Sequence, residues 1–120
     1  MANSKLEERL LAAILAAGMD RPERDYQFLR PIRRLEIDFA WKPLRLGIEV
    51  QGGTWKKGKT AHSWGPGQRR DADKLNLAAT NAWTIMYATP DMLTNKRIGE
   101  FISLVIVAYE QRGGERADGC

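Results

Sequence analysis

The sequence has very few of the side chains that bind soft metal ions. Of its 120 residues, one is a cysteine, Cys120, and one is a histidine, His62. A single cysteine cannot form an internal disulfide or build a zinc site, which needs several such ligands. A lone histidine also excludes the two-histidine arrangements found in some nucleases and metalloproteases. Metal sites rich in histidine or cysteine are therefore excluded.

Long apolar runs are also missing. No stretch approaches the roughly 18–20 apolar residues that a membrane-spanning helix needs, so we expect no association with a membrane. A length of 120 residues, 43% of them hydrophobic, is typical of one globular domain. We expect that domain to cover residues 1–112 and the polar segment 113–120 to be a disordered tail. The net charge of +4 slightly favours a polyanion as a partner.

The hydrophobic pattern predicts a mixed α/β domain with the order α-β-β-(β)-α-β-α. Two alternating segments flank a turn at 41–43, which is typical of a β-hairpin. The later strand of the hairpin, the helix after it and the following strand should form a right-handed β-α-β crossover with parallel strands. The predicted elements are helices over 4–17, 68–81 and 95–111, strands over 34–41, 44–51 and 83–88, and a short extended stretch over 26–29.

Apolar side chains indicate which face of each element is buried. Alternation places Leu35, Ile37 and Phe39 on one face of the first hairpin strand. The helix over 68–81 offers Leu75, Ala78 and Ala79 to the core. The helix over 95–111 has an apolar side that either covers the sheet or contributes to a homodimer. That side consists of Ile98, Ile102, Val105, Ile106 and Tyr109.

Carboxylates on the polar face of the hairpin are the most informative feature. The turn brings Asp38 roughly level with the 47–49 region of the other strand, where Glu49 lies on the polar face. Two carboxylates on one sheet face form a hard, oxygen-rich site that suits Mg²⁺ or Mn²⁺. Such a cation can activate water and stabilise charge on a phosphorus atom. The alternative is an ordinary solvent-facing row of polar residues.

Glu7 is a third acidic candidate. It lies beside the apolar stripe formed by Leu11 and Ile14 on the first helix. A carboxylate on a buried face needs a partner. The alternative role for Glu7 is to cap the N-terminus of this helix or to complement its dipole.

A loop rich in glycine, lysine and tryptophan follows the hairpin. Lysines can bind phosphates without reading sequence, and exposed aromatic rings can stack on unpaired bases. A solvated lysine loop is the alternative. The nucleic-acid-binding candidates in the loop and at the start of the next helix are Trp55, Lys56, Lys57, Lys59, Arg69 and Arg70.

The order of these blocks resembles the PD-(D/E)xK nuclease superfamily, and in particular a phage and bacterial branch related to the very-short-patch-repair endonuclease. The resemblance covers roughly residues 5–93. The blocks that carry it are Arg34–Trp41, Leu46–Trp55, Gly58–His62, Asp71–Asn76 and Ala82–Met86. It implies a single restriction-endonuclease-like domain, with a mixed sheet flanked by helices.

The resemblance also assigns roles to individual residues. Asp38, Glu49 and the carbonyl of Val50 would bind Mg²⁺, for which Mn²⁺ can substitute. Glu7 would orient the attacking water. Gln51 stands where the superfamily usually has lysine, so another cation or a second metal must stabilise the developing negative charge. Lys74 is a candidate for that cation. His62 would position water or the leaving group, unless it is simply a surface loop residue.

The resulting hypothesis is a Mg²⁺-dependent endonuclease that hydrolyses phosphodiester bonds of duplex or branched DNA. A nicking or junction-resolving enzyme is the expected subclass, acting in the cytoplasm of a bacterium or a phage-infected cell. Two alternatives stay open. One is a catalytically weak nucleic-acid-binding module, which Gln51 favours. The other is a structural subunit of a phage or repair complex.

Overall fold

The computed structural model describes residues 4–28, 35–51 and 66–117 of the chain. Its elements, in chain order, are as follows: α1 (Ser4–Ala16), β1 (Glu23–Gln27), β2 (Glu36–Trp41), β3 (Leu46–Val50), α2 (Pro66–Thr80), β4 (Thr84–Ala88) and α3 (Ile98–Gln111). Short 3₁₀ helices lie at Lys42–Leu44 and Pro90–Leu93. The predicted hairpin, crossover and flanking helices are confirmed. No helix within the described ranges has both the length and the apolar character needed to cross a membrane.

The four strands form one mixed sheet in the order β1-β2-β3-β4. β1 and β2 are antiparallel, as are β2 and β3, whereas β3 and β4 are parallel. The turn between β2 and β3 contains Pro43, and Arg45 closes it with a left-handed φ of 54°. α2 connects the parallel strands, as a crossover requires.

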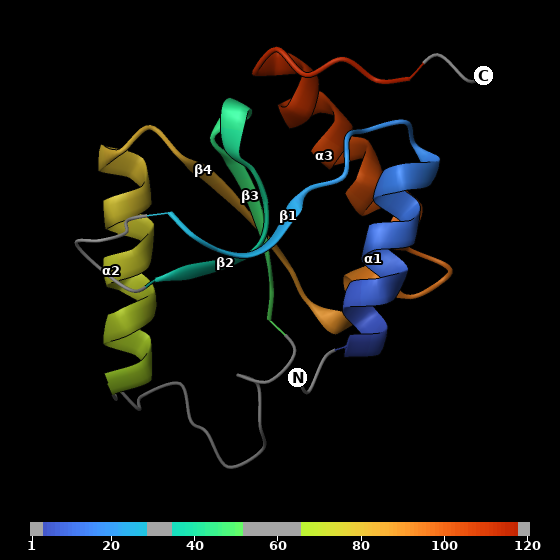
Figure 1. Cartoon of the computed structure of the whole chain (residues 1–120). Helices are drawn as coiled ribbons and strands as arrows, with labels where there is room; N and C mark the ends of the chain where they lie inside the picture. Colours follow the sequence, from blue (N-terminus) through green and yellow to red (C-terminus); the bar gives the residue numbers. More distant parts are fainter. Residues whose placement is uncertain (1–3, 29–34, 52–65, 118–120) are drawn as a thin grey trace.

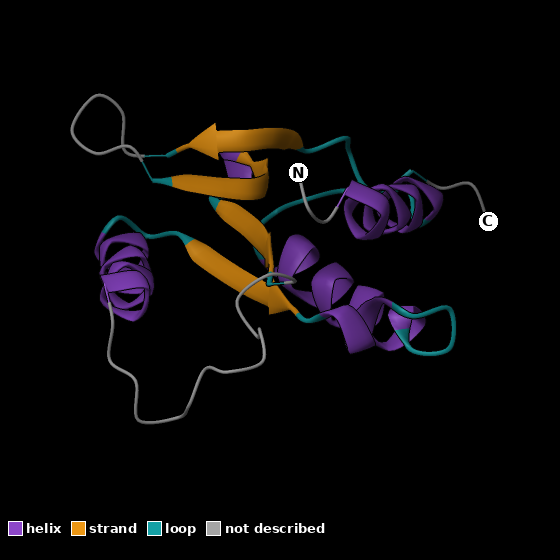
Figure 2. Cartoon of the chain, turned by 90° about the horizontal axis from the view of Figure 1, so that it is seen from below, coloured by secondary structure: helices purple, strands orange, loops and turns teal. Residues whose placement is uncertain are grey.

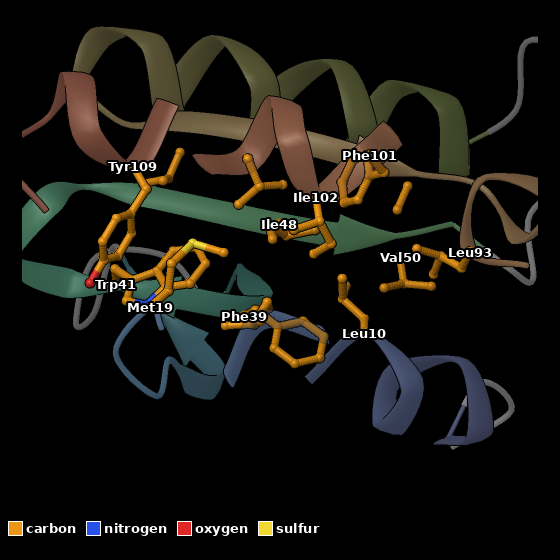
Figure 3. Close-up of a cluster of buried hydrophobic side chains, with 14 residues drawn as sticks. Leu10, Met19, Phe39, Trp41, Ile48, Val50, Leu93, Phe101, Ile102 and Tyr109 are labelled. Atoms are coloured by element: carbon orange, nitrogen blue, oxygen red, sulfur yellow. The ribbon is translucent and has the colours of Figure 1, made fainter. Parts of the chain in front are cut away.

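The sheet separates the helices into two layers. Figures 1 and 2 show α1 and α3 on one side of the sheet and α2 on the other. The main core lies on the α1 and α3 side (Figure 3). It includes Trp41 and Tyr109, whose ring centroids are 5.2 Å apart in an edge-to-face arrangement. The polar atoms of both rings bond to the backbone of Asp20. Trp41 Nε1 donates to the Asp20 carbonyl at 2.7 Å, and the Asp20 N–H donates to the Tyr109 hydroxyl at 3.0 Å.

The predicted apolar side of α3 covers the sheet. Ile102, Val105 and Tyr109 are buried in the main core, and Ile98 and Ile106 pack against it. These side chains are therefore occupied within the domain. The outward apolar residues of α3 are instead Leu104 and Val107.

A second, smaller core lies on the α2 side of the sheet. It buries Ile37, Ala40, Ala78 and Trp83. Ile37 and Phe39 therefore lie in different cores, whereas simple alternation predicts that they share a face. The β1–β2 ladder omits Asp38, which lies between them. Leu75 is also not a core residue, since 43% of it is exposed.

The segment after α3 was predicted to be a disordered tail, but its described part forms backbone hydrogen bonds with the rest of the domain. In its described part, residues 113–117, Gly114 N–H donates to the Tyr109 carbonyl at 2.9 Å. Further along, Ala117 N–H donates to the Gly18 carbonyl at 2.6 Å. Gly114 has no room for a Cβ beside the Tyr109 ring, which explains why glycine is present. This segment therefore packs across the end of α1.

Candidate functional site

The hairpin ladder ends where the candidate carboxylates begin. The last pair toward this end of the hairpin joins Phe39 to Ile48. Beyond it, Val50 N–H donates to Asp38 Oδ2 at 2.8 Å, and Asp38 N–H donates to Glu49 Oε1 at 3.2 Å. Carboxylate oxygens thus accept hydrogen bonds from backbone N–H groups here, whereas backbone carbonyls accept them elsewhere in the ladder. The result is a pair of neighbouring, partly buried carboxylates.

A lysine from α2 completes the environment of Glu49. Lys74 Nζ lies 2.6 Å from Glu49 Oε2, and only 11% and 18% of the two side chains are exposed. Lys74 Nζ also donates to the backbone carbonyl of Glu36 at 2.6 Å. The positive charge beside Glu49 therefore comes from α2. Gln51 follows β3, and its N–H donates to the Ala88 carbonyl at 2.8 Å.

α1 supplies the third carboxylate from the opposite side of the sheet. Glu7 is buried, with 6% of the residue exposed, and forms an ion pair with Arg24 of β1. Burial raises the pKa of Glu7, and the negative charge of Asp38 raises it further. The charge and hydrogen bond of Arg24 lower it only in part. The Arg24 guanidinium lies 4.5 Å from the centroid of the Phe39 ring. Glu7 is thus held close enough to Asp38 for their charges to interact.

The two hairpin carboxylates are also harder to ionise than usual. Burial raises the pKa of Asp38, although the hydrogen bond from Val50 and the charge of Lys74 oppose this. Burial likewise raises the pKa of Glu49. The hydrogen bond from Lys74 lowers it in part, and the negative charge of Asp38 raises it further. Desolvation and mutual repulsion are therefore only partly offset by the nearby cations. Carboxyl groups in this condition are typical of functional sites.

These raised values predict a stability effect for Asp38→Asn. Because the pKa of Asp38 is higher in the folded than in the unfolded chain, stability falls as pH rises from the ordinary value of 3.8 through the raised value. Asparagine removes the charge, and its side-chain oxygen can still accept the Val50 N–H. In metal-free buffer we expect the unfolding midpoint of the variant to exceed that of the unmodified chain by a few degrees at neutral pH.

The difference should shrink as the pH falls through the raised pKa of Asp38 toward 3.8, because the carboxyl is then protonated in the folded chain and increasingly protonated in the unfolded chain. Scanning calorimetry across the range from about pH 4 to about pH 8 measures it. A lower midpoint for the variant at neutral pH would contradict this account of Asp38.

Two charged residues of β1 belong to the surroundings of the site and were not predicted. Arg24 pairs with Glu7, and the charge of Asp25 raises the pKa of both Glu7 and Asp38. The β1–β2 ladder skips Asp25 and Asp38, although residues on either side pair, and Asp25 has a left-handed φ of 52°. The charge-rich run at 23–25 is typical of a loop, so only the pairing with β2 identifies it as a strand.

Several predicted residues cannot be placed at the site. His62, Trp55, Lys56, Lys57 and Lys59 lie outside the described residues. Arg69 and Arg70 lie in α2, but their side chains are outside the described part. The residues that the structure does bring together are Glu7, Asp38, Glu49 and Lys74, with Val50 as a backbone donor.

Comparisons of this chain with protein families, curated proteins and solved structures found no match. The chemistry of the site therefore follows from its own residues. Among the described residues, no three acidic, histidine or cysteine side chains are grouped so as to hold a metal ion. Asp38 and Glu49 nevertheless present neighbouring carboxylates, and Glu49 already binds a cation, the Lys74 ammonium. Two neighbouring carboxylates are the kind of hard oxygen donor that a divalent cation such as Mg²⁺ prefers.

Proposed function

We propose that this protein is a divalent-metal-dependent endonuclease that hydrolyses phosphodiester bonds of DNA. The observation that carries the proposal is the paired Asp38 and Glu49 at the end of the hairpin, with Lys74 against Glu49. The buried Glu7, whose pKa the charge of Asp38 raises, supports it. The resemblance to the PD-(D/E)xK superfamily points to the same reaction, and a mixed sheet between helices is compatible with a restriction-endonuclease-like domain.

Each of these side chains would have its own role in the proposed reaction. Asp38, Glu49 and the Val50 carbonyl would hold Mg²⁺, or Mn²⁺ in its place. When bound, the cation would activate water and offset the negative charge that develops on the phosphate. Lys74 supplies a positive charge beside the same site, the role that Gln51 cannot fill. Glu7, whose pKa is raised, would orient the attacking water and take its proton.

DNA is the proposed substrate because of charge and of the neighbouring loop. The chain carries a net charge of +4, and the lysines and tryptophan of residues 55–59 lie a few residues after β3 in the sequence. Basic residues there would contact phosphates. A nicking or junction-resolving enzyme of a bacterial or phage-infected cytoplasm is the proposed subclass. A homodimer would place two such sites on one branched substrate.

A panel of labelled DNA substrates tests this function. Linear duplex, mismatched duplex, single strand, flap and four-way junction are each incubated with Mg²⁺, Mn²⁺ or EDTA. We expect cutting with either cation and none with EDTA, and the preferred substrate identifies the subclass. Binding without cutting under every condition would reject the endonuclease and favour the nucleic-acid-binding module. Absence of both would favour the structural subunit.

A further inference from the structure

Both carboxylate oxygens of Glu49 are already engaged in this structure. Oε1 accepts the Asp38 N–H at 3.2 Å, and Oε2 accepts from Lys74 Nζ at 2.6 Å. A divalent cation that binds Glu49 must therefore take an oxygen from one of these donors or share it. The lysine contact brings a positive charge, which would repel an incoming cation at the same oxygen.

Lys74 also has a second acceptor within reach. Its Nζ donates to the backbone carbonyl of Glu36 at 2.6 Å, so the ammonium bridges Glu49 and β2. An ammonium has three N–H donors, and loss of the Glu49 contact would leave the Glu36 contact in place. The buried position of Lys74 can therefore be kept while Glu49 changes partner.

The geometry points to Lys74 as a resident counter-ion that occupies Glu49 until a divalent cation displaces it. This inference rests on the proposed metal site and adds a function for the lysine before any substrate binds. A partly buried carboxylate without a positive partner is costly, so the ammonium stabilises the empty site. The same contact lowers the affinity of the site for metal, because binding must first break it.

The inference predicts that two Lys74 variants differ in metal affinity. If the lysine acted only on the substrate, removing its charge would leave metal affinity unchanged. If it competes for Glu49, Lys74→Gln should bind Mn²⁺ about tenfold more tightly than the unmodified chain, since one unit charge at the site is removed. Lys74→Arg keeps the charge and should bind about as weakly as the unmodified chain.

Calorimetric titration of the full chain with Mn²⁺, without DNA, measures these affinities. Glu49→Gln serves as the variant that should lose binding, and thermal unfolding shows that each variant is folded. Equal or weaker Mn²⁺ binding by Lys74→Gln overturns the inference, as does the absence of binding in every variant. If the unmodified chain cuts no DNA but Lys74→Gln binds Mn²⁺ more tightly, the endonuclease is rejected and the counter-ion role stands.

A second measurement needs no variant. The ¹⁵N resonance of the Lys74 ammonium is followed by NMR while Mg²⁺ is added to the folded chain. Displacement from Glu49 should move this resonance in proportion to metal occupancy, which the calorimetric titration calibrates. A resonance that stays in place at saturating Mg²⁺ overturns the inference.

Discussion

Glu49→Gln is expected to lower the rate of DNA cleavage by at least about a thousandfold while DNA binding remains measurable. The substitution preserves the size of the side chain and its ability to accept the Asp38 N–H. It removes the negative charge that would hold the metal and that pairs with Lys74 at 2.6 Å. In the proposed reaction, cleavage would depend on the bound cation, whereas DNA affinity would depend mainly on basic residues elsewhere.

Glu36→Gln is the matched control. Glu36 is an exposed carboxylate on the same hairpin, two residues before Asp38, and its side chain bonds to Gln27 at 3.3 Å. Its backbone carbonyl, which holds Lys74, is unchanged by the substitution. Single-turnover cleavage and DNA-binding titrations compare the two variants. Similar cleavage rates for both would show that Glu49 has no special role and would remove the basis for the proposed metal centre.

Phe39→Ala is expected to lower the free energy of unfolding by about 3–5 kcal/mol. Phe39 is fully buried in the main core, with 0% exposed (Figure 3). Removal of its ring leaves a cavity between β2 and α1, and it also removes the surface on which the Arg24 guanidinium rests at 4.5 Å. A loss of this size is a large part of the stability of an ordinary domain.

Urea denaturation followed by tryptophan fluorescence measures this change. Leu104→Ala is the control, because Leu104 lies on the outer side of α3 and is 61% exposed. We expect the control to change stability by less than about 0.5 kcal/mol. A loss below about 1 kcal/mol for Phe39→Ala would mean that the ring is not packed as described.

The core and the candidate site share the strand β2. β2 contributes Phe39 and Trp41 to the main core and Asp38 to the candidate site. Because the apolar side chains anchor the strand, the backbone N–H and carboxylate of Asp38 are held against β3. A destabilised core should therefore weaken the site as well as the fold.

Periodic patterns predicted most of the fold. The hairpin, the long C-terminal helix and the β-α-β crossover all follow from residues that are near one another in the chain. Helical spacing at Ile102, Val105 and Tyr109 identifies the buried face of the C-terminal helix, and that face is buried in the structure. Local sequence is sufficient there, because burying one face of an element requires that pattern.

Sequence patterns gave wrong predictions where contacts with distant parts of the chain determine the local structure. β1 reads ERDYQ, a charged stretch with little strand preference, and it is a strand because β2 offers it hydrogen-bond partners. Ile37 packs in the smaller core and not with Phe39 as predicted, and the β1–β2 ladder omits Asp38 between these two residues. Residues 114–117 are ordered by partners at Tyr109 and Gly18, which composition cannot reveal.

The sequence by itself placed Asp38 and Glu49 on facing strands of one hairpin, because a turn of known length determines which residues lie opposite each other. Only the tertiary structure decided which cations meet these carboxylates. Lys74 is 25 residues from Glu49, and Arg24 is 17 residues from Glu7. The first pair requires α2 to pack on the sheet and the second requires α1 to do so, and that packing depends on the whole core.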